Sequence, residues 1–179
     1  RQRSEIVKVA EKDGRAGRMV FVTVRHATSS ERGLAVEEEQ DIVYVAMPER
    51  WEAPAPVPPP AEVLWREAVA VDPVLLFRFS ALTFNGHRIH YDLPYATEVE
   101  KYPGLIVHGP LQAMLLMDLA CRSRPGRRPA RFEFRGVRPL FHFERPELLG
   151  RQAEDGDELI VGNGAGATTM QASVRWRDG

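Results

Sequence analysis

The chain has 179 residues, 44% of them hydrophobic, which is enough for one medium-sized domain or roughly one and a half small ones. Its net charge of −1 excludes the global basic field that attracts nucleic acid or an anionic membrane. The longest apolar run, residues 113–119, is too short to span a bilayer, and residues 1–9 lack the apolar segment of a signal peptide. The single cysteine, Cys121, excludes an internal disulfide, and its apolar surroundings predict a small buried side chain.

Residues 1–48 predict three strands and no helix. Apolar and β-branched residues gather at 6–12, 19–26 and 36–44, and turn signals separate them at 13–17 and 29–33. Three strands cannot bury a sheet face unaided, so we expect this segment to pack on the rest of the chain or on another chain.

A proline-rich segment at residues 49–61 divides the chain. It contains Pro54, Pro56, Pro58, Pro59 and Pro60. Because so many prolines exclude a helix or a central strand, we expect an extended, semi-rigid linker between residues 1–48 and residues 62–179.

The second part begins with a strand and two helices. Residues 62–71 predict a strand, and Asp72-Pro73 predicts the start of a helix that Asn85-Gly86 ends. A shorter helix is expected over 93–100. Residues 111–122 are apolar on nearly every side, which predicts the most buried helix of the molecule.

Three strands are expected after this helix, over 130–140, over 151–162 with an interruption at 155–157, and over 168–177. One buried helix among antiparallel strands predicts an α+β fold in which the sheet curls around a central helix.

Three of the five histidines lie just before this helix, and they carry most of the functional information. His90 is able to take and give a proton near neutral pH, and Asn85 is able to orient a water molecule but not to act as a base. Gly109 stands at the expected helix N-terminus, where unpaired amides and the helix dipole favour negative charge. A proton carrier beside such donors suits chemistry on an activated carbonyl compound.

Simpler interpretations stay open at this point. His87 and His90 are also typical of polar loop residues, and with His108 they are typical of a metal cluster. His108, Gly109 and Pro110 also describe an ordinary helix entry. The arginines at 122–128 indicate either a solvated loop or a contact for a phosphate-bearing ligand.

The segments Ser80-Ala-Leu-Thr-Phe-Asn-Gly-His-Arg-Ile-His-Tyr-Asp92 and Tyr102-Pro-Gly-Leu-Ile-Val-His-Gly-Pro-Leu111 resemble the MaoC-like (R)-specific enoyl-thioester hydratases. The resemblance is to the two-hot-dog subgroup of mesaconyl-CoA and itaconyl-CoA hydratases and fungal mitochondrial 3-hydroxyacyl-thioester dehydratases. It implies a hot-dog fold, with residues 62–179 as a complete domain carrying the active site. Residues 1–48 then resemble the last strands of a partial first hot dog, whose central helix the segment lacks.

The resemblance also implies roles for individual residues. His90 matches the catalytic histidine, Asn85 stands where the family usually has an aspartate, and Gly109 matches the glycine whose N–H binds the thioester oxygen. The usual Asp–His pair is therefore incomplete. Either Asn85 orients the water, or His87 or Asp92 supplies the second proton-handling group, or activity is lost. The expected substrate-binding residues are Gly109, His108, His87, Arg88 and Asp92.

The implied reaction is the reversible hydration of an enoyl thioester to a 3-hydroxyacyl thioester, which makes the expected enzyme a hydro-lyase. No metal or other cofactor is expected, since coenzyme A or phosphopantetheine arrives with the substrate. We expect a homodimer without nucleic-acid or membrane partners, in the cytoplasm or, in a eukaryote, the mitochondrion. The alternatives are a hot-dog thioesterase and a non-catalytic acyl-thioester-binding or structural subunit.

Overall fold

The chain divides into two compact units, Arg1–Pro48 and Glu49–Gly179, in a computed structural model that describes residues 1–14, 17–46 and 49–177. The second unit begins with the proline-rich segment, residues 49–61, whose role as a linker stays a prediction. That the first unit is part of a hot-dog domain stays a prediction. None of the helices in the described ranges is long and apolar enough to cross a membrane.

The first unit is an antiparallel sheet with the strand order β1-β2-β3. Its strands are β1 (Gln2–Gly14), β2 (Gly17–Ser30) and β3 (Gly33–Val45), so the three predicted strands are confirmed and each is longer than expected. Gly14 pairs with Gly17 across the predicted turn, whose residues 15–16 lie outside the described residues. Several apolar side chains of the outer strands are exposed, among them Ile6, Val9, Val36 and Tyr44.

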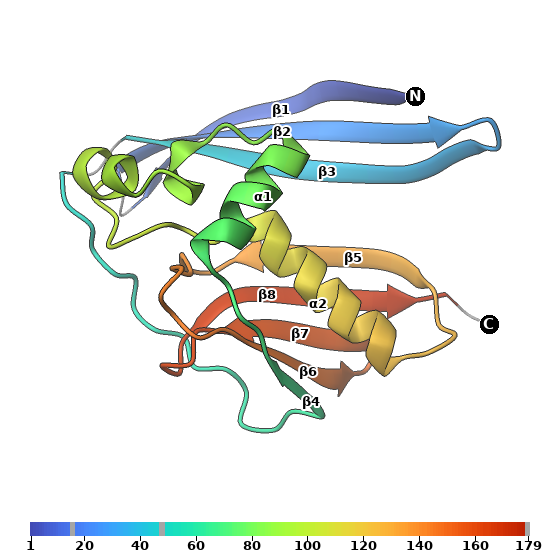
Figure 1. The fold of residues 1–179 in the computed structure, drawn as a ribbon. Helices are drawn as coiled ribbons and strands as arrows, with labels where there is room; N and C mark the ends of the chain where they lie inside the picture. Colours follow the sequence, from blue (N-terminus) through green and yellow to red (C-terminus); the bar gives the residue numbers. More distant parts are fainter. Residues whose placement is uncertain (15–16, 47–48, 178–179) are drawn as a thin grey trace. The chain divides into compact units, whose positions relative to one another are not determined.

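The second unit contains a five-stranded antiparallel sheet with the order β4-β6-β7-β8-β5 (Figure 1). The strands are β4 (Trp65–Ala68), β5 (Pro129–Gly136), β6 (Glu147–Ala153), β7 (Gly156–Gly162) and β8 (Thr168–Trp176).

The sequence prediction of one interrupted strand over 151–162 is wrong. The interruption is the turn of the β6–β7 hairpin, where Ala153 pairs with Gly156. Gly156 has a φ of 141°, which favours glycine, so the chain reverses here instead of continuing. The predicted strand over 130–140 likewise ends early, at Gly136.

Helix α2 (Gly109–Ser123) lies across this sheet, which confirms the predicted central helix (Figure 1). Leu116 on α2 and Leu159 on β7 are both 0% exposed and belong to the same core cluster. The prediction that α2 is buried on nearly every side is wrong, because the sheet covers only one side of it. Met114 is 61% exposed, and Cys121, expected to be buried, is exposed as well.

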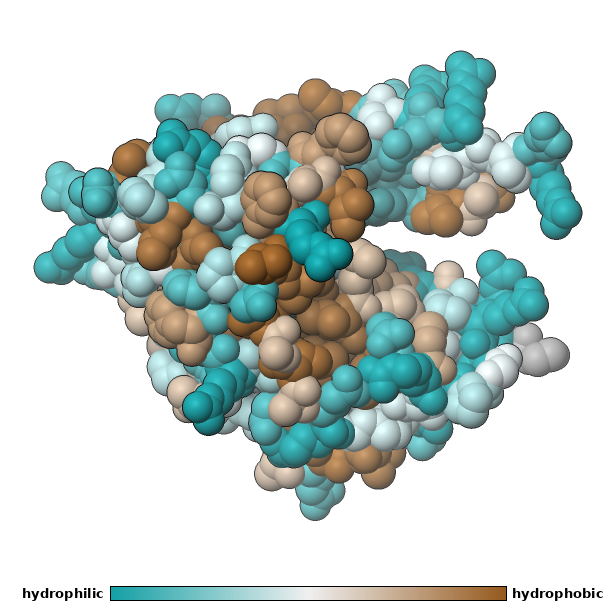
Figure 2. Space-filling view, in the orientation of Figure 1, coloured by the Kyte–Doolittle hydropathy of each residue, from teal (hydrophilic) through white to brown (hydrophobic). Residues whose placement is uncertain are grey.

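Helix α1 (Pro73–Thr83) begins as predicted, with the Asp72 side chain accepting a hydrogen bond from the Leu75 N–H at 2.7 Å. It ends at Thr83 and is capped by Phe84, directly before the predicted break at Asn85-Gly86. Phe84 has a φ of 53°, a left-handed conformation that glycine usually occupies at this position, and its side chain is 96% exposed. Figure 2 shows apolar side chains gathered over α1 and the adjoining part of α2.

Residues 49–61 contain neither helix nor strand, as the prolines predict. This segment is nevertheless attached to the second unit. The Val57 carbonyl accepts a hydrogen bond from the Thr168 N–H at 2.7 Å, and the Trp51 ring packs against Tyr102 and Phe141 with centroid distances of 5.3 and 5.6 Å.

The basic segment after α2 has a structural role at Arg124. Its guanidinium binds the Asp157 carboxylate at 2.7 Å and lies over the Trp65 ring. Only 1% of the Asp157 side chain is exposed, so Arg124 fixes the end of α2 to β7. Neither of the two interpretations of the arginine cluster therefore describes Arg124.

Candidate active site

The segment after α1 is shaped by Asn85. Its N–H donates to the Ser80 carbonyl at 2.9 Å, and its side-chain oxygen accepts from the His87 N–H at 3.0 Å. The 3-10 turn η1 (Arg88–His90) follows and turns His90 inward, leaving it 8% exposed. Asn85 thus positions the loop that carries His90, and its contact with a water molecule stays a prediction.

His90 is held in one tautomer by the backbone. Its Nδ1 lies 2.8 Å from the Ile106 carbonyl oxygen, and because a carbonyl only accepts, Nδ1 carries the proton. Nε2 therefore keeps its lone pair in the neutral ring. Burial lowers the pKa of His90 below its usual value, and the bond to Ile106 opposes this only in part. His90 is thus a neutral imidazole at pH 7, with Nε2 as the basic atom.

His108 is fully buried and lies against His90. The two rings stack with a centroid distance of 3.7 Å and an angle of 18° between their planes. His108 Nε2 is 2.8 Å from the Ser80 hydroxyl, and Phe79 packs against the ring at 4.8 Å. Burial, together with the neighbouring His90, lowers the pKa of His108 from 6.5 to about 4. His108 therefore stays neutral and supports the face of the His90 ring.

Gly109 follows His108 and begins α2. In the described part of the chain its N–H makes no hydrogen bond within the fold. A Cβ added at Gly109 would meet only Met170 Cε, at an ordinary contact distance of 3.8 Å, so packing does not require glycine here. Since the His90 ring stacks on that of His108, the residue directly before Gly109, His90 lies next to the start of α2.

His87 forms a second polar pair beside His90. Its Nε2 lies 2.9 Å from Glu100 Oε1, and its ring stands edge-on to His90 at a centroid distance of 5.7 Å. The Glu100 side chain is only 13% exposed, whereas that of His87 is 52% exposed. The predicted substrate contact of His87 stays a prediction, and the structure adds a carboxylate that the sequence analysis did not single out.

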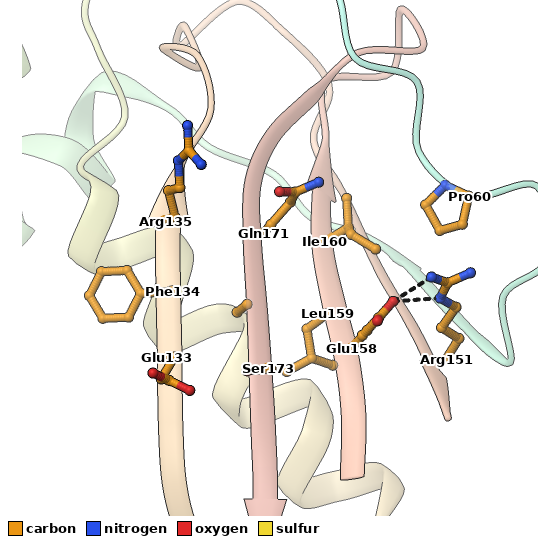
Figure 3. Close-up of a pocket in the computed structure, with 11 residues that line it drawn as sticks. Pro60, Glu133, Phe134, Arg135, Arg151, Glu158, Leu159, Ile160, Gln171 and Ser173 are labelled. Atoms are coloured by element: carbon orange, nitrogen blue, oxygen red, sulfur yellow. Dashed lines mark hydrogen bonds and ion pairs between the residues drawn. The ribbon is translucent and has the colours of Figure 1, made fainter. Parts of the chain in front are cut away.

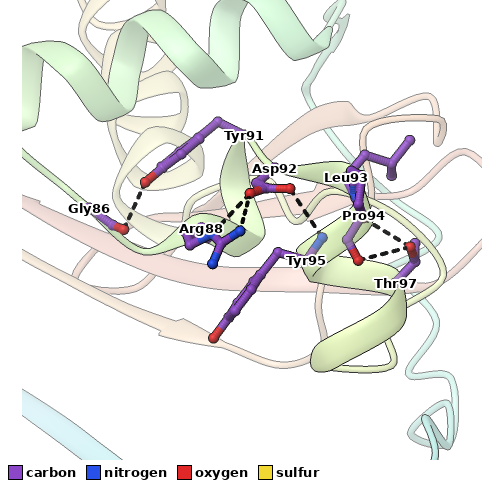
Figure 4. A network of polar contacts seen from close by, with 8 residues as sticks. All are labelled: Gly86, Arg88, Tyr91, Asp92, Leu93, Pro94, Tyr95 and Thr97. Carbon is purple, nitrogen blue, oxygen red and sulfur yellow. Dashed lines mark hydrogen bonds and ion pairs between the residues drawn. The ribbon is translucent and has the colours of Figure 1, made fainter.

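Arg88 and Asp92 bind each other, as Figure 4 shows. Arg88 donates twice to Asp92 Oδ2, at 2.9 and 2.6 Å, and lies over the Tyr95 ring. The other Asp92 oxygen accepts from the Tyr95 N–H at 3.1 Å. The hydrogen bond from Arg88 lowers the pKa of Asp92. Both oxygens of Asp92 thus have partners other than His90, and substrate contacts of this pair stay predictions.

The three histidines do not form a metal site. Across the described ranges, no three His, Cys, Asp or Glu side chains are arranged to hold a metal ion. Two of the rings stack face to face, and their Nδ1 and Nε2 atoms already bind Ile106 and Ser80, respectively.

A shallow cavity of about 510 Å³ lies elsewhere, over β5, β7 and β8 on the sheet face away from α2 (Figure 3). Its lining is Pro60, Glu133, Phe134, Arg135, Arg151, Glu158, Leu159, Ile160, Gln171, Ala172 and Ser173. It shares no residue with the histidine cluster. Arg151 and Glu158 pair with each other there, and the lining mixes charged and apolar side chains.

Three contributors to the histidine cluster were not assigned a role from the sequence: Ser80, the Ile106 carbonyl and Glu100. Ser80 lies within the segment that carries the resemblance and on the buried face of α1, which is a usable signal. The Ile106 carbonyl and Glu100 lie next to the histidines because of the course of the backbone. No sequence pattern predicts that course.

A sequence model of the family described as hydroxyacyl-thioester dehydratase type 2 matches residues 1–142. The chain belongs to this family. It is 47% identical, over 175 residues, to the mesaconyl-C(4)-CoA hydratase of Chloroflexus aurantiacus, a match that covers 97% of this chain and 62% of that protein.

Solved structures with low sequence identity share the fold. HtdX of Mycobacterium tuberculosis has a TM-score of 0.70 at 20% identity, covering 98% of this chain and 67% of HtdX. A MaoC-like dehydratase from Phytophthora capsici has a TM-score of 0.72 at 14% identity, covering 99% of this chain and 65% of that chain. The resemblance stated from the sequence and the α+β hot-dog fold class are thus confirmed.

Proposed function

We propose that this member of the family catalyses the reversible addition of water to a trans-2-enoyl thioester, giving a 3-hydroxyacyl thioester. One observation carries the proposal: a neutral, buried histidine with a fixed tautomer, His90, adjoins the unpaired amide at the start of α2. The family match supports the same reaction class.

His90 Nε2 is the proposed base. It takes a proton from a water molecule while the water oxygen attacks Cβ of the enoyl thioester. The electron pair of the Cα–Cβ double bond moves towards the thioester, whose carbonyl oxygen gains negative charge. Protonation of Cα completes the addition, so that one water enters and nothing leaves.

The Gly109 N–H is the proposed donor to the thioester oxygen. It stands at the helix N-terminus, where the macrodipole adds partial positive charge. A fixed donor of this kind stabilises an oxygen that becomes more negative in the transition state than in the substrate.

The test is hydration of crotonyl-CoA and of mesaconyl-C4-CoA by the purified chain, followed as loss of enoyl absorbance. We expect His90→Ala to lower kcat by about 10²- to 10⁴-fold, the usual contribution of a general acid–base group. His26→Gln is the matched control, because the His26 side chain hydrogen-bonds to Ser4 on the neighbouring strand of the first unit and to no other described residue. Equal rates for wild type and His90→Ala would contradict the proposal.

The same assay separates the alternatives. Release of free thiol without loss of the double bond would indicate a thioesterase. Binding of the thioester without either reaction would indicate a non-catalytic subunit, an alternative that Asn85 keeps open.

The substrate carries its own coenzyme A or phosphopantetheine, and we propose no further cofactor. A branched dicarboxylic acyl group is the first to test, since the Chloroflexus relative is a mesaconyl-C(4)-CoA hydratase. The homodimer, and the cytoplasm or mitochondrion as compartment, are also proposals. Light scattering of the purified chain tests the homodimer.

A further inference from the structure

Hydration moves two protons, and the proposed role of His90 as base accounts for only one of them. The base takes a proton from water, and Cα must receive one, either from the same group or from a second one. In the resembled family a carboxylate stands five residues before the histidine, where this chain has Asn85. An amide does not release a proton at neutral pH, so Asn85 cannot replace that carboxylate as a proton carrier.

The carboxylates nearest to His90 in the sequence differ in their surroundings. Asp92 is occupied by Arg88 and by the Tyr95 N–H. Glu98 is exposed, and its carboxylate makes no hydrogen bond or ion pair with the residues that the structure describes. Glu100 differs from both, because its side chain is mostly buried and is bonded to His87.

Glu100 has no basic partner apart from His87. In the described part of the chain, no lysine or arginine lies within ion-pair distance of its carboxylate. A carboxylate with 13% exposure is costly unless a positive or donating group compensates it. His87 Nε2, at 2.9 Å, is that group, and the contact leaves Nδ1 as the nitrogen able to exchange a proton.

His87 is also held beside the base. The edge-on contact of its ring with His90 places the two imidazoles side by side, 5.7 Å apart between centroids. The Asn85 side chain fixes the His87 backbone N–H at 3.0 Å. Asn85 therefore supports the position of His87 and does not itself replace the missing carboxylate.

We infer that His87 is the catalytic acid of this site and that Glu100 is the positioning residue that holds it. The inference rests on the proposed hydration. His90 Nε2 gains the proton of the attacking water, and protonated His87 gives its Nδ1 proton to Cα. Solvent then carries a proton from His90 back to His87, whose side chain is 52% exposed, and the site is restored.

Three variants test the pair by kcat and KM of crotonyl-CoA hydration. We expect His87→Asn to lower kcat by about 10²- to 10⁴-fold and Glu100→Gln, which keeps an acceptor for Nε2, by about tenfold or more. Because Glu100 acts through His87, the double variant should lose no more than His87→Asn alone. Glu98→Gln, an exposed carboxylate of the same turn, should retain wild-type kcat.

The pH profile gives a readout that a merely structural role would not move. The groups that face His90 are His87 and Glu100 from the turns on one side, and His108 and the Ile106 carbonyl from the start of α2 and the segment before it. The Glu100 charge raises the pKa of His90, whereas His87 lowers it. The acid limb of kcat/KM should therefore move to lower pH in Glu100→Gln and to higher pH in His87→Asn.

The outcomes separate the two proposals. A wild type without hydration, or a fully active His90→Ala, would overturn the reaction itself. Hydration that needs His90 but is unchanged in Glu100→Gln and His87→Asn would overturn only the assignment of the second pair. The assignment would also be rejected if the losses in kcat of the two single variants multiplied in the double variant. An acid limb of kcat/KM that does not move in either variant would reject it as well. If Glu100→Gln does not fold, His87→Asn decides the question, because a wild-type kcat in that variant would overturn the assignment.

Discussion

Replacing Gly109 by proline removes the one backbone donor assigned to the thioester oxygen. The structure indicates that the change is compatible with the fold. The Gly109 N–H has no hydrogen bond to lose within the described ranges, and proline is favoured at the first position of a helix. His108, with φ −54° and ψ 134°, already has the extended conformation that precedes proline.

The expected loss follows from the chemistry of a single oxyanion donor. Removing one lowers kcat by about 10²- to 10³-fold, equivalent to about 2.7–4 kcal/mol of transition-state stabilisation. Gly109→Ala is the control, since it keeps the N–H and its Cβ meets only Met170 at 3.8 Å. Both variants carry a side chain in front of Pro110, so the alanine variant reports the cost of that restriction.

The assay compares kcat and kcat/KM for enoyl-thioester hydration, with thermal melting of both variants as a check on folding. We expect the alanine variant to stay within a few-fold of wild type and the proline variant to fall by the full amount. A proline variant that melts like the alanine variant and turns over at the same rate would refute the oxyanion role of Gly109.

Three further predictions concern stability. Arg124→Met should lower the free energy of unfolding by about 3 kcal/mol in urea denaturation, because it leaves the buried Asp157 carboxylate without its cation. Arg131→Met, which breaks the exposed ion pair with Glu133, should lower the free energy of unfolding by less than about 1 kcal/mol. Equal losses in the Arg124 and Arg131 variants would contradict this explanation. Phe84→Gly should raise the free energy of unfolding by about 1 kcal/mol in the same experiment, because glycine adopts the left-handed backbone conformation without strain and the Phe84 side chain is 96% exposed. A lower free energy of unfolding would show that the ring makes a stabilising contact. The last prediction is a pH dependence. The folded pKa of His108, about 4, lies below its ordinary 6.5, so the unfolded chain takes up the proton first as the pH falls. The stability that this residue contributes is therefore full above pH 6.5 and is lost between pH 6.5 and 4, by up to about 3 kcal/mol. Urea titrations at several pH values should show this slope in wild type and a flatter one in His108→Phe.

The sequence predicts those elements whose signals are local. Asp72-Pro73 marks the start of α1, because a capping carboxylate and a proline each act within one turn. The end of α1 was placed too late, because Phe84 adopts a conformation that its residue type disfavours. Cys121 was misplaced for a different reason. Which side of α2 the sheet covers depends on the path of distant strands and not on the helix itself.

The same distinction applies to the site. The proximity of His90 to the start of α2 was predicted, because the residues on both sides are close in sequence and resemble one family. Glu100 was missed because it follows the π-helical turn η2 (Tyr95–Val99), in which the Glu100 N–H bonds to the Tyr95 carbonyl at 3.1 Å. A regular α-helical turn has one residue fewer per hydrogen bond and would direct Glu100 about 100° elsewhere around the axis. No sequence pattern predicts the extra residue in this π-helical turn.

Hydrogen-bond satisfaction gives an independent reason to place the reaction here. Folded proteins pair nearly all of their buried polar groups, so an unpaired one needs an explanation, which a ligand or an ordered water can supply. In the described part of this cluster, the atoms without a partner in the fold are His90 Nε2, His87 Nδ1, the Gly109 N–H and His108 Nδ1, and among the side-chain atoms only His108 Nδ1 is fully buried. His108 Nδ1 is inaccessible, because His108 is 0% exposed. The other three are the atoms proposed as base, acid and oxyanion donor, a set suited to hydration of an enoyl thioester.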